Sequence, residues 1–417
     1  DEWVNNMHAS PELVQALHKS ADIYERMGFG SHASLMRSDS EAARMFAATL
    51  LDDGATGARQ NMTATGYNQM YQMQMEDKFQ TFDAAWRDYR ISQGHTRIPG
   101  TKLFINPKSG KDSMRELEQG VWDILAQWDA AGTRTQIKGV NPHFLKAANA
   151  HADTMELAPN ILRNGDEAND AHRVLGSEGL KTNAGYMPLK WNNDAIKAMG
   201  EVKAQSIIAT GYVNRGMDAD LADEIAGAVI KRQADKAAGM GGTNVDYDSA
   251  MQIASDVING GSKELTVEAA EAITASLQKH GTGKQGYLRS RVDIDLTVPG
   301  IRDIVDNNIV KNMRSYMGDV SGSAALARKG IRSKDELENI ITATARDMAK
   351  KDGDVLFETA KQDLDDIIAG FMSRPVSGAL SATGRRIQQG TNLAVLGQLG
   401  FMQAAETANI ASHAFAI

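Results

Sequence analysis

Only a few residues in this chain have types and spacings that could support chemistry. The sequence Gly-Thr-Gly-Lys at 281–284 is similar to the end of a phosphate-binding loop. That motif also requires an earlier glycine at a fixed distance and a hydroxyl residue directly after the lysine, where this chain has Gln285. We therefore predict a turn at 281–284 and no nucleotide site.

Histidine and aspartate side chains could bind a metal ion or transfer a proton. His143 and His151 lie eight residues apart on a predicted helix, but no carboxylate stands at a spacing that completes a metal site, so we predict surface histidines. Asp293 and Asp295 alternate with apolar residues, which favours a solvated strand face over a catalytic pair. The aspartates of a later predicted helix favour a solvated face in the same way: Asp363, Asp365 and Asp366. The sequence thus predicts no catalytic, cofactor-binding or metal-binding residue, and no enzyme activity for these residues.

Charge gives a stronger signal than these motifs do. Residues 279–334 hold eleven lysines and arginines against five acids. A surface that faces phosphates or DNA would use such a segment, and its candidate residues are Lys284, Arg289, Arg291, Arg302, Lys311, Arg314, Arg328, Lys329, Arg332 and Lys334. The alternative is internal pairing with residues 335–366, which hold ten acids and four bases. Both interpretations stay open at this point.

The last predicted element carries no charge between residues 387 and 405. Its apolar residues suit either an oligomer contact or a membrane contact: Leu393, Leu396, Leu399, Phe401 and Met402. Glutamine, asparagine and threonine side chains within the stretch weaken the case for insertion into a bilayer. We favour a helix buried in an oligomer, with membrane contact as the alternative.

Helical periodicity dominates the elements that must position these residues. Apolar positions predict helices at 11–27, 40–51, 65–86, 113–128, 141–155, 194–212, 218–237, 301–317, 321–329, 334–349 and 353–372, with two short helices within 246–280. Strict alternation at 292–298 is the one strand signal. Residues 92–110 read as an exposed connection, and the irregular stretch 165–191 as a functional or interface element. The predicted fold class is mainly α, elongated and in several parts, with at most a small β element near 288–298.

Composition shifts divide the chain into five regions. They are an N-terminal helical region at 1–91, helices with long irregular connections at 92–193, a helical region at 194–280, a basic and acidic helical region at 281–376, and a helix rich in small residues at 377–417.

The overall composition excludes several classes of protein. The 417 residues contain no cysteine, which rules out disulfides, thiolate zinc sites and a cysteine nucleophile. A net charge of −8 argues against a wholly basic nucleic-acid binder, although not against a local basic surface. No N-terminal segment has the pattern of a signal peptide. Because the first residue is Asp1, we expect the chain to be a piece of a longer protein.

Several short stretches together resemble, in order, the middle part of the large inner-core ejection protein of T-seven-like short-tailed bacteriophages. The first group is Ser-Asp-Ser-Glu-Ala-Ala-Arg at 38–44, Gly-Ala-Arg-Gln at 57–60 and Tyr-Asn-Gln-Met-Tyr at 67–71. The second is Gly-Tyr-Met-Pro-Leu at 185–189. The third is Leu-Arg-Ser-Arg at 288–291, Asp-Ile-Asp-Leu at 293–296 and Asn-Met-Arg-Ser-Tyr at 312–316. The fourth runs from 379–381 through Asn392 and 399–400 to 406–408.

The resemblance implies a structural component of a genome-ejection apparatus. Such a protein is stored in the virion interior, leaves through the tail and refolds. It then forms an oligomeric ring or tube, together with other core proteins, as a DNA conduit across the host periplasm and inner membrane. The family also carries a lytic transglycosylase module with a catalytic Glu-Ser pair, and this chain contains no such pair. The resemblance therefore transfers no catalytic residue. The alternative function is a helical spacer in a giant virion-carried enzyme, either a peptidoglycan lytic transglycosylase or a virion RNA polymerase.

Overall fold

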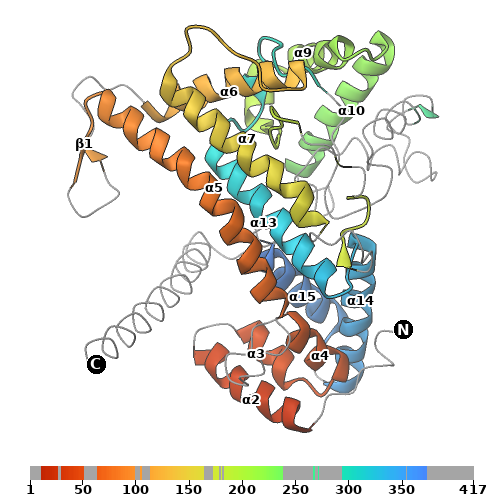
Figure 1. Ribbon diagram of the computed structural model, residues 1–417. Helices are drawn as coiled ribbons and strands as arrows, with labels where there is room; N and C mark the ends of the chain where they lie inside the picture. Colours follow the sequence, from red (N-terminus) through yellow and green to blue (C-terminus); the bar gives the residue numbers. More distant parts are fainter. Residues whose placement is uncertain are drawn as a thin grey trace, which may run out of the picture. The chain divides into compact units, whose positions relative to one another are not determined.

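A computed structural model describes most of the first 372 residues (Figure 1). The described residues are 11–26, 30–50, 63–98, 104–105, 113–163, 172–177, 180, 183–237, 266–267, 271, 294–353 and 355–372. The chain divides into two compact units, residues 1–374 and 375–417. Everything described below belongs to the first unit.

The described part is mainly helical, as the sequence predicts. Its helices are α2 (Pro11–Arg26), α3 (Gly30–Arg37), α4 (Glu41–Leu50), α5 (Ala64–Ser92), α6 (Ser113–Ala131), α7 (Pro142–Leu162), α8 (Asn193–Met199), α9 (Glu201–Asn214), α10 (Ala219–Ala237), η2 (Arg302–Ile304), α13 (Ile309–Arg328), α14 (Lys334–Lys351) and α15 (Phe357–Phe371). Two short strands, β1 (Thr96–Arg97) and β2 (Phe104–Ile105), form an antiparallel pair inside the connection predicted at 92–110.

The centre of the fold is a layer of three long helices, α5, α7 and α13, which lie side by side (Figure 1). Helix α5 runs for 29 residues and begins at Thr63, whose hydroxyl accepts a hydrogen bond from the Gly66 amide. Its inner face holds Phe79 and Phe82, whose stacked rings have centroids 5.0 Å apart. Helix α6 covers the end of this layer by packing on α5 and α7.

Helix α13 is the most enclosed of the three. Its sequence from Met317 to Ala327 is buried at every position, and most of these residues are small. A helix that is buried on all sides must pack backbone against backbone, which only small side chains permit. Gly322, for example, lies against Met372.

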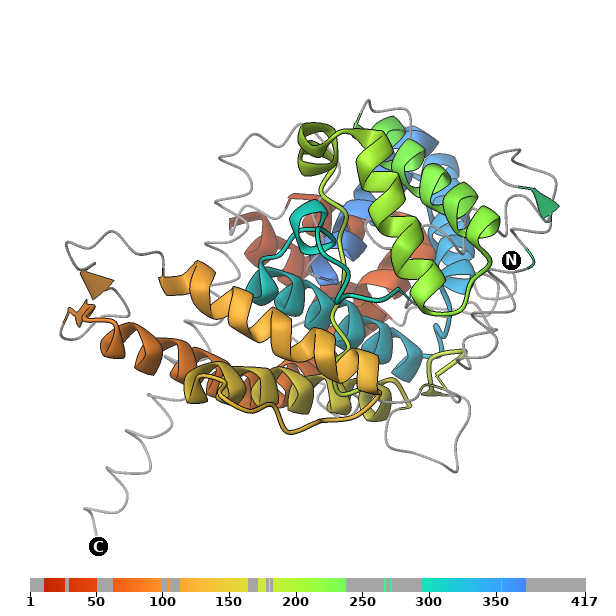
Figure 2. The same ribbon diagram turned by 90° about the horizontal axis from the view of Figure 1, so that it is seen from above.

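Two groups of helices flank this centre. Helices α2, α3 and α4 pack on one another, and α4 also packs on α14, which pairs with α15. Helices α8, α9 and α10 form the second group, in which α9 and α10 lie side by side (Figure 2). The second group also contacts the turn-rich segment 294–305.

Several predicted boundaries were wrong, each for a local reason. The helix predicted at 194–212 is two helices, because Gly200 between them has a φ of 94°, outside the helical range. The helix predicted at 141–155 continues through Pro159 to Leu162. The helices predicted at 301–317 and 321–329 are instead a short 3₁₀ turn followed by the single helix α13.

The strand predicted at 292–298 does not form over its described residues, 294–298, which agrees with a fold class that has at most a small β element there. Residues 294–300 form turns rather than a strand. Asp295 shapes them, since its carboxylate accepts hydrogen bonds from the Thr297 amide at 3.0 Å and the Thr297 hydroxyl at 2.7 Å. The apolar residues of this segment are nevertheless buried, namely Ile294, Leu296 and Val298. The alternating pattern therefore reflects which side chains are buried and does not indicate a strand.

Candidate functional site

The basic residues predicted to face phosphates mostly have partners within the fold. Arg302 lies 3.5 Å from Asp123 on α6, Lys311 lies 2.6 Å from Asp306, and Arg314 lies 3.9 Å from Asp83 on α5. These carboxylates precede or lie within the basic segment. They do not belong to the acidic stretch 335–366.

The other described members of that set lie near the ends of α13 and α14. Arg328 and Lys329 both stand 5.6 Å from the centre of the Tyr67 ring, a cation–π geometry. Burial lowers the pKa of Lys329. Arg332 donates its side-chain Nε–H to the Arg173 carbonyl at 3.0 Å, and Glu336 accepts its backbone N–H.

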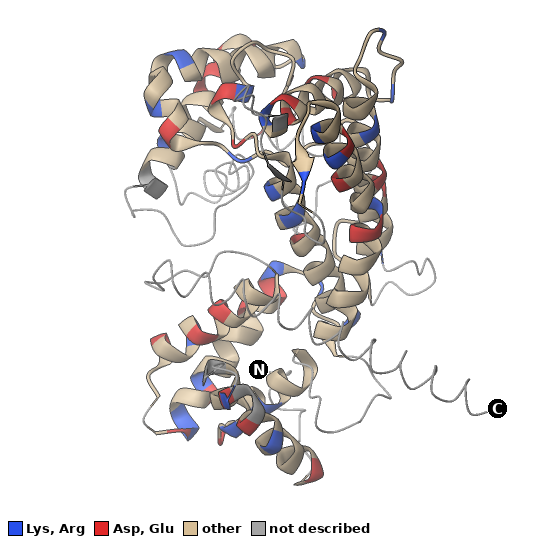
Figure 3. Ribbon diagram, turned by 90° about the vertical axis from the view of Figure 1, so that its left-hand side faces the viewer, with Lys and Arg blue, Asp and Glu red and all other residues tan. Residues whose placement is uncertain are grey.

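Lys334 is the first residue of α14. Lys284, Arg289 and Arg291 lie outside the described residues, as do the predicted C-terminal contacts Leu393, Leu396, Leu399, Phe401 and Met402. In the view of Figure 3, basic and acidic residues are interspersed along the described helices. A DNA-facing surface stays a prediction for these positions.

The two histidines of α7 have different surroundings. His143 lies near the Tyr89 ring, with ring centroids 6.0 Å apart. His151 is 1% exposed, so the prediction of a surface histidine is wrong for this residue. Burial lowers the pKa of His151 to about 3, which keeps the ring neutral. Within the described residues, no group of three histidines or acids could hold a metal ion.

Burial and neighbouring side chains determine the properties of the aspartates that were considered for acid–base chemistry. Burial raises the pKa of Asp295, but hydrogen bonds from Thr297 and Asn214 and the charge of Arg215 outweigh it, so the pKa is lowered overall. Burial raises the pKa of Asp363. Asp365 pairs with Lys361 at 3.0 Å, and Asp366 accepts a hydrogen bond from Gln362. Asp293 lies outside the described residues.

A buried ion pair, together with one hydrogen bond to its carboxylate, joins three segments that are far apart in the sequence. The Arg215 guanidinium, just after α9, donates to Asp129 Oδ2 on α6 at 2.5 Å. The amide of Asn183 donates to the other carboxylate oxygen of Asp129 at 2.8 Å. The Asp129 side chain is 1% exposed and that of Arg215 is 18% exposed. We call Asp129, Asn183 and Arg215 the α6–α9 polar cluster.

The backbone around this cluster is tightly packed. Asn183 also accepts a hydrogen bond from the Gly185 amide at 2.9 Å. A Cβ atom at Gly185 would overlap the backbone of Asp129 and Leu125, so only glycine fits there. No short-range motif could have revealed the cluster, since its members are 54 and 86 residues apart. A charged residue directly after Trp128, on the apolar face of α6, is the one local signal.

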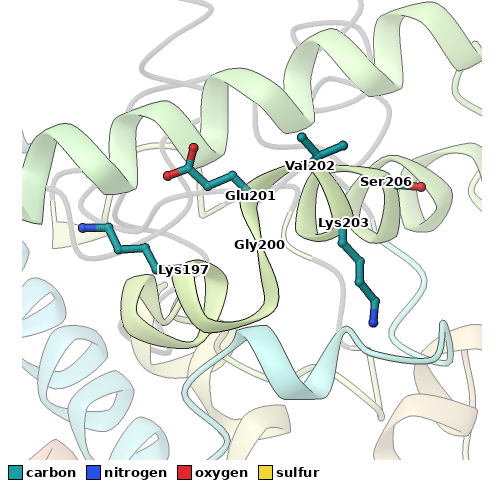
Figure 4. Close-up of a pocket in the computed structure, with 6 residues that line it drawn as sticks. All are labelled: Lys197, Gly200, Glu201, Val202, Lys203 and Ser206. Carbon is teal, nitrogen blue, oxygen red and sulfur yellow. The ribbon is translucent and has the colours of Figure 1, made fainter.

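An open surface pocket lies at the junction of α8 and α9 (Figure 4). Its lining residues are Lys197, Gly200, Glu201, Val202, Lys203 and Ser206. The start of α9 is a region of positive helix dipole, and Glu201 in the first turn already provides a negative charge there. All six residues are exposed, so the pocket offers little desolvated surface to a ligand.

None of the described helices is both long and apolar enough to cross a bilayer. The uncharged segment 387–405 lies outside the described residues.

The described part of the chain is a mainly helical protein in which the buried Arg215–Asp129 ion pair joins the residue after α9 to α6. No protein-family model matches the chain, and a comparison with curated proteins gives no match.

Proposed function

We propose that this chain is a structural component of a phage genome-ejection apparatus. It is stored in the virion core and, after ejection, assembles into a ring or tube that conducts DNA across the host periplasm and inner membrane. Support comes from the ordered stretches that resemble the large inner-core ejection protein. In this proposal no bond-making chemistry belongs to these residues.

The observation that carries the proposal is where the resembling stretches lie in the fold. Tyr186 of the 185–189 stretch contacts Tyr316 of the 312–316 stretch, with ring centroids 5.7 Å apart. Next to them, Lys190 donates to the Ser315 hydroxyl at 3.0 Å. Two stretches more than a hundred residues apart in the sequence are therefore partners in one packing contact.

The first resembling stretch, residues 38–44, also forms a contact between distant elements. The Ser38 hydroxyl and the Asp39 amide donate to the two carboxylate oxygens of Asp352, at 2.6 and 2.7 Å. The Ser40 hydroxyl donates to Asp347 at 2.6 Å, and it also caps α4 by accepting from the Ala43 amide. These bonds attach α4 to the C-terminal end of α14.

When the residues that resemble a family make packing contacts, they favour a scaffold function. Catalytic residues would instead lie together around one pocket. A chain of mostly local helical contacts also suits a protein that must refold after passing through a tail. The absence of cysteine prevents misbridging when the chain enters an oxidising compartment. The expected partners are further copies of the chain, other core proteins, the genomic DNA and the inner membrane.

Mass spectrometry of purified virions tests the first half of the proposal. We expect peptides of this chain in virions of the phage that encodes it, in amounts above one copy per particle. Sedimentation and electron microscopy of the purified chain with the other core proteins test the second half, and we expect closed rings or tubes.

Two results would contradict the proposal. One is absence from virions; the other is a monomer both alone and with the core proteins. Translation of the complete reading frame distinguishes the alternative function, because a transglycosylase or polymerase module beside this segment favours a spacer within an enzyme.

A further inference from the structure

Helices α8, α9 and α10, together with residues 294–303, behave as one packed body, which we call the arm. The Asp295 amide donates to the Gly211 carbonyl of α9 at 3.0 Å, and Asn214 donates to the Asp295 carboxylate at 2.8 Å. A Cβ atom at Gly211 would lie 2.5 Å from the Ile294 side chain, so the two backbones approach closely. The segment 294–303 therefore belongs with α9 and not with the helix α13 that follows it.

The connections of the arm to α7 and to α13 pass through adjacent segments. The Asn192 amide donates to the Ile304 carbonyl at 2.9 Å, and the Asp306 amide donates to the Lys190 carbonyl at 2.7 Å. Trp191 and Val305 pair between these bonds as an antiparallel bridge. We call residues 190–192 and 304–306 the neck.

A body whose entry and exit are adjacent has the topology of an inserted module. The chain passes through the neck into α8 and returns through it before α13. In hinged proteins, a few residues at the ends of elements absorb the change in backbone angles when such a body rotates.

Among the described residues, two ion pairs join the arm to α6, and their surroundings differ. Arg215–Asp129 spans 2.5 Å, with side-chain exposures of 18% and 1%. Arg302–Asp123 spans 3.5 Å, with exposures of 29% and 58%. Exposed pairs contribute little to stability, whereas removing one partner of a buried pair leaves an uncompensated charge and is strongly unfavourable. Removing one partner of the buried pair should therefore destabilise the closed position of the arm more than removing one partner of the exposed pair.

We propose that the arm is a hinged module and that the Arg215–Asp129 ion pair is the latch that holds it closed against α6. Loss of the latch frees the arm to move about the neck, while α5, α7 and α13 stay packed. This inference goes beyond the proposed function and does not depend on it, since it concerns a movement within one chain.

Pulsed electron–electron distance measurements on the full chain test the latch. The chain has no native cysteine, so two introduced cysteines carry the only spin labels. The pair Gln127→Cys and Asp220→Cys, both exposed, reports the distance from α6 to the arm. The pair Gln127→Cys and Thr81→Cys reports the distance from α6 to α5 as an internal reference.

Each label pair is measured in the unaltered background and in three variants. Arg215→Ala removes the cation, Asp129→Asn removes the anion at nearly constant volume, and Arg302→Ala is the matched control on the exposed pair. We expect both latch variants to raise the population of open arm at least about tenfold and to leave the reference distance unchanged. Arg302→Ala should leave both distances as they are.

Every other pattern contradicts the latch. If the two distances broaden together in Arg215→Ala and in Asp129→Asn, the ion pair stabilises the whole unit and holds no separate arm. If neither distance changes in these variants, the arm is held by its other contacts. If Arg302→Ala opens the arm as far as the latch variants do, burial of the Arg215 pair has no special role.

Discussion

At the scale of single residues, two histidines, the buried His151 and the half-buried His32, tie the stability of this protein to pH. His151 is fully enclosed in α7, and its Nδ1 has no hydrogen-bond partner among the described residues. Burial lowers the pKa of His151 to about 3 and that of His32 to about 4. In the unfolded chain both imidazole rings become protonated as the pH falls below about 6.5, whereas in the folded chain they stay neutral at that pH. Stability from these groups is therefore present above pH 6.5 and is lost as the pH falls toward their folded pKa values.

Replacing His151 by leucine removes one of these titrations. Between pH 6 and pH 4 we expect the free energy of unfolding of His151→Leu to fall less steeply than that of the unaltered protein, by about 1.4 kcal/mol per pH unit. Denaturant titrations at several pH values measure this slope. His18→Gln is the control, because the His18 side chain is exposed on α2. An unchanged slope in His151→Leu would show that the ring is protonated in the folded protein.

At the scale of elements, local signals predict helices well where the apolar face is simple. The prediction for α4 is within one residue at each end, because Phe46, Ala47 and Leu50 all face one side. Helix α13 defeats the same approach, since Gly318, Ser321 and Gly322 read as a break in an amphipathic helix. Their burial depends on the neighbouring helices α5 and α7, which no local window contains.

The close packing of α13 leads to a prediction about its small residues. Ala325 is 0% exposed, and a leucine there must displace neighbouring helices. We expect Ala325→Leu to lower the free energy of unfolding by about 1–3 kcal/mol. Ala130→Leu, at an exposed position on α6, is the control and should change it by less than about 0.5 kcal/mol. Thermal and denaturant unfolding measure both. Equal stability of the two variants would mean that α13 has free space around Ala325.

At the scale of the whole molecule, the sequence shows how much charge there is but not where it pairs. The excess of bases at 279–334 fits either a phosphate-facing surface or internal pairing. In the structure, Arg302 pairs with Asp123 on α6 and Arg314 with Asp83 on α5, both far upstream in the sequence. The α6–α9 polar cluster was missed for the same reason. Ion-pair partners depend on which elements come together after folding, and no local stretch of a single sequence shows this.

The division of the chain after Arg374 leads to the last prediction. Residues 1–374 form a compact unit of their own, so we expect them to fold without the rest. We expect the truncated chain to unfold within a few degrees of the full chain. If the apolar C-terminal residues make the oligomer contact predicted from the sequence, truncation should also abolish concentration-dependent assembly.

A full-length control separates these side chains from chain length. It carries serine at each of the predicted contact positions, Leu393, Leu396, Leu399, Phe401 and Met402. Sedimentation should show the same loss of assembly in this variant as in the truncation, because burial of such side chains drives association. Release of dye from liposomes, measured in parallel, distinguishes membrane contact from self-association. Assembly that survives both changes would place the oligomer contact within residues 1–374, and a large drop in melting temperature on truncation would show that the two units fold together.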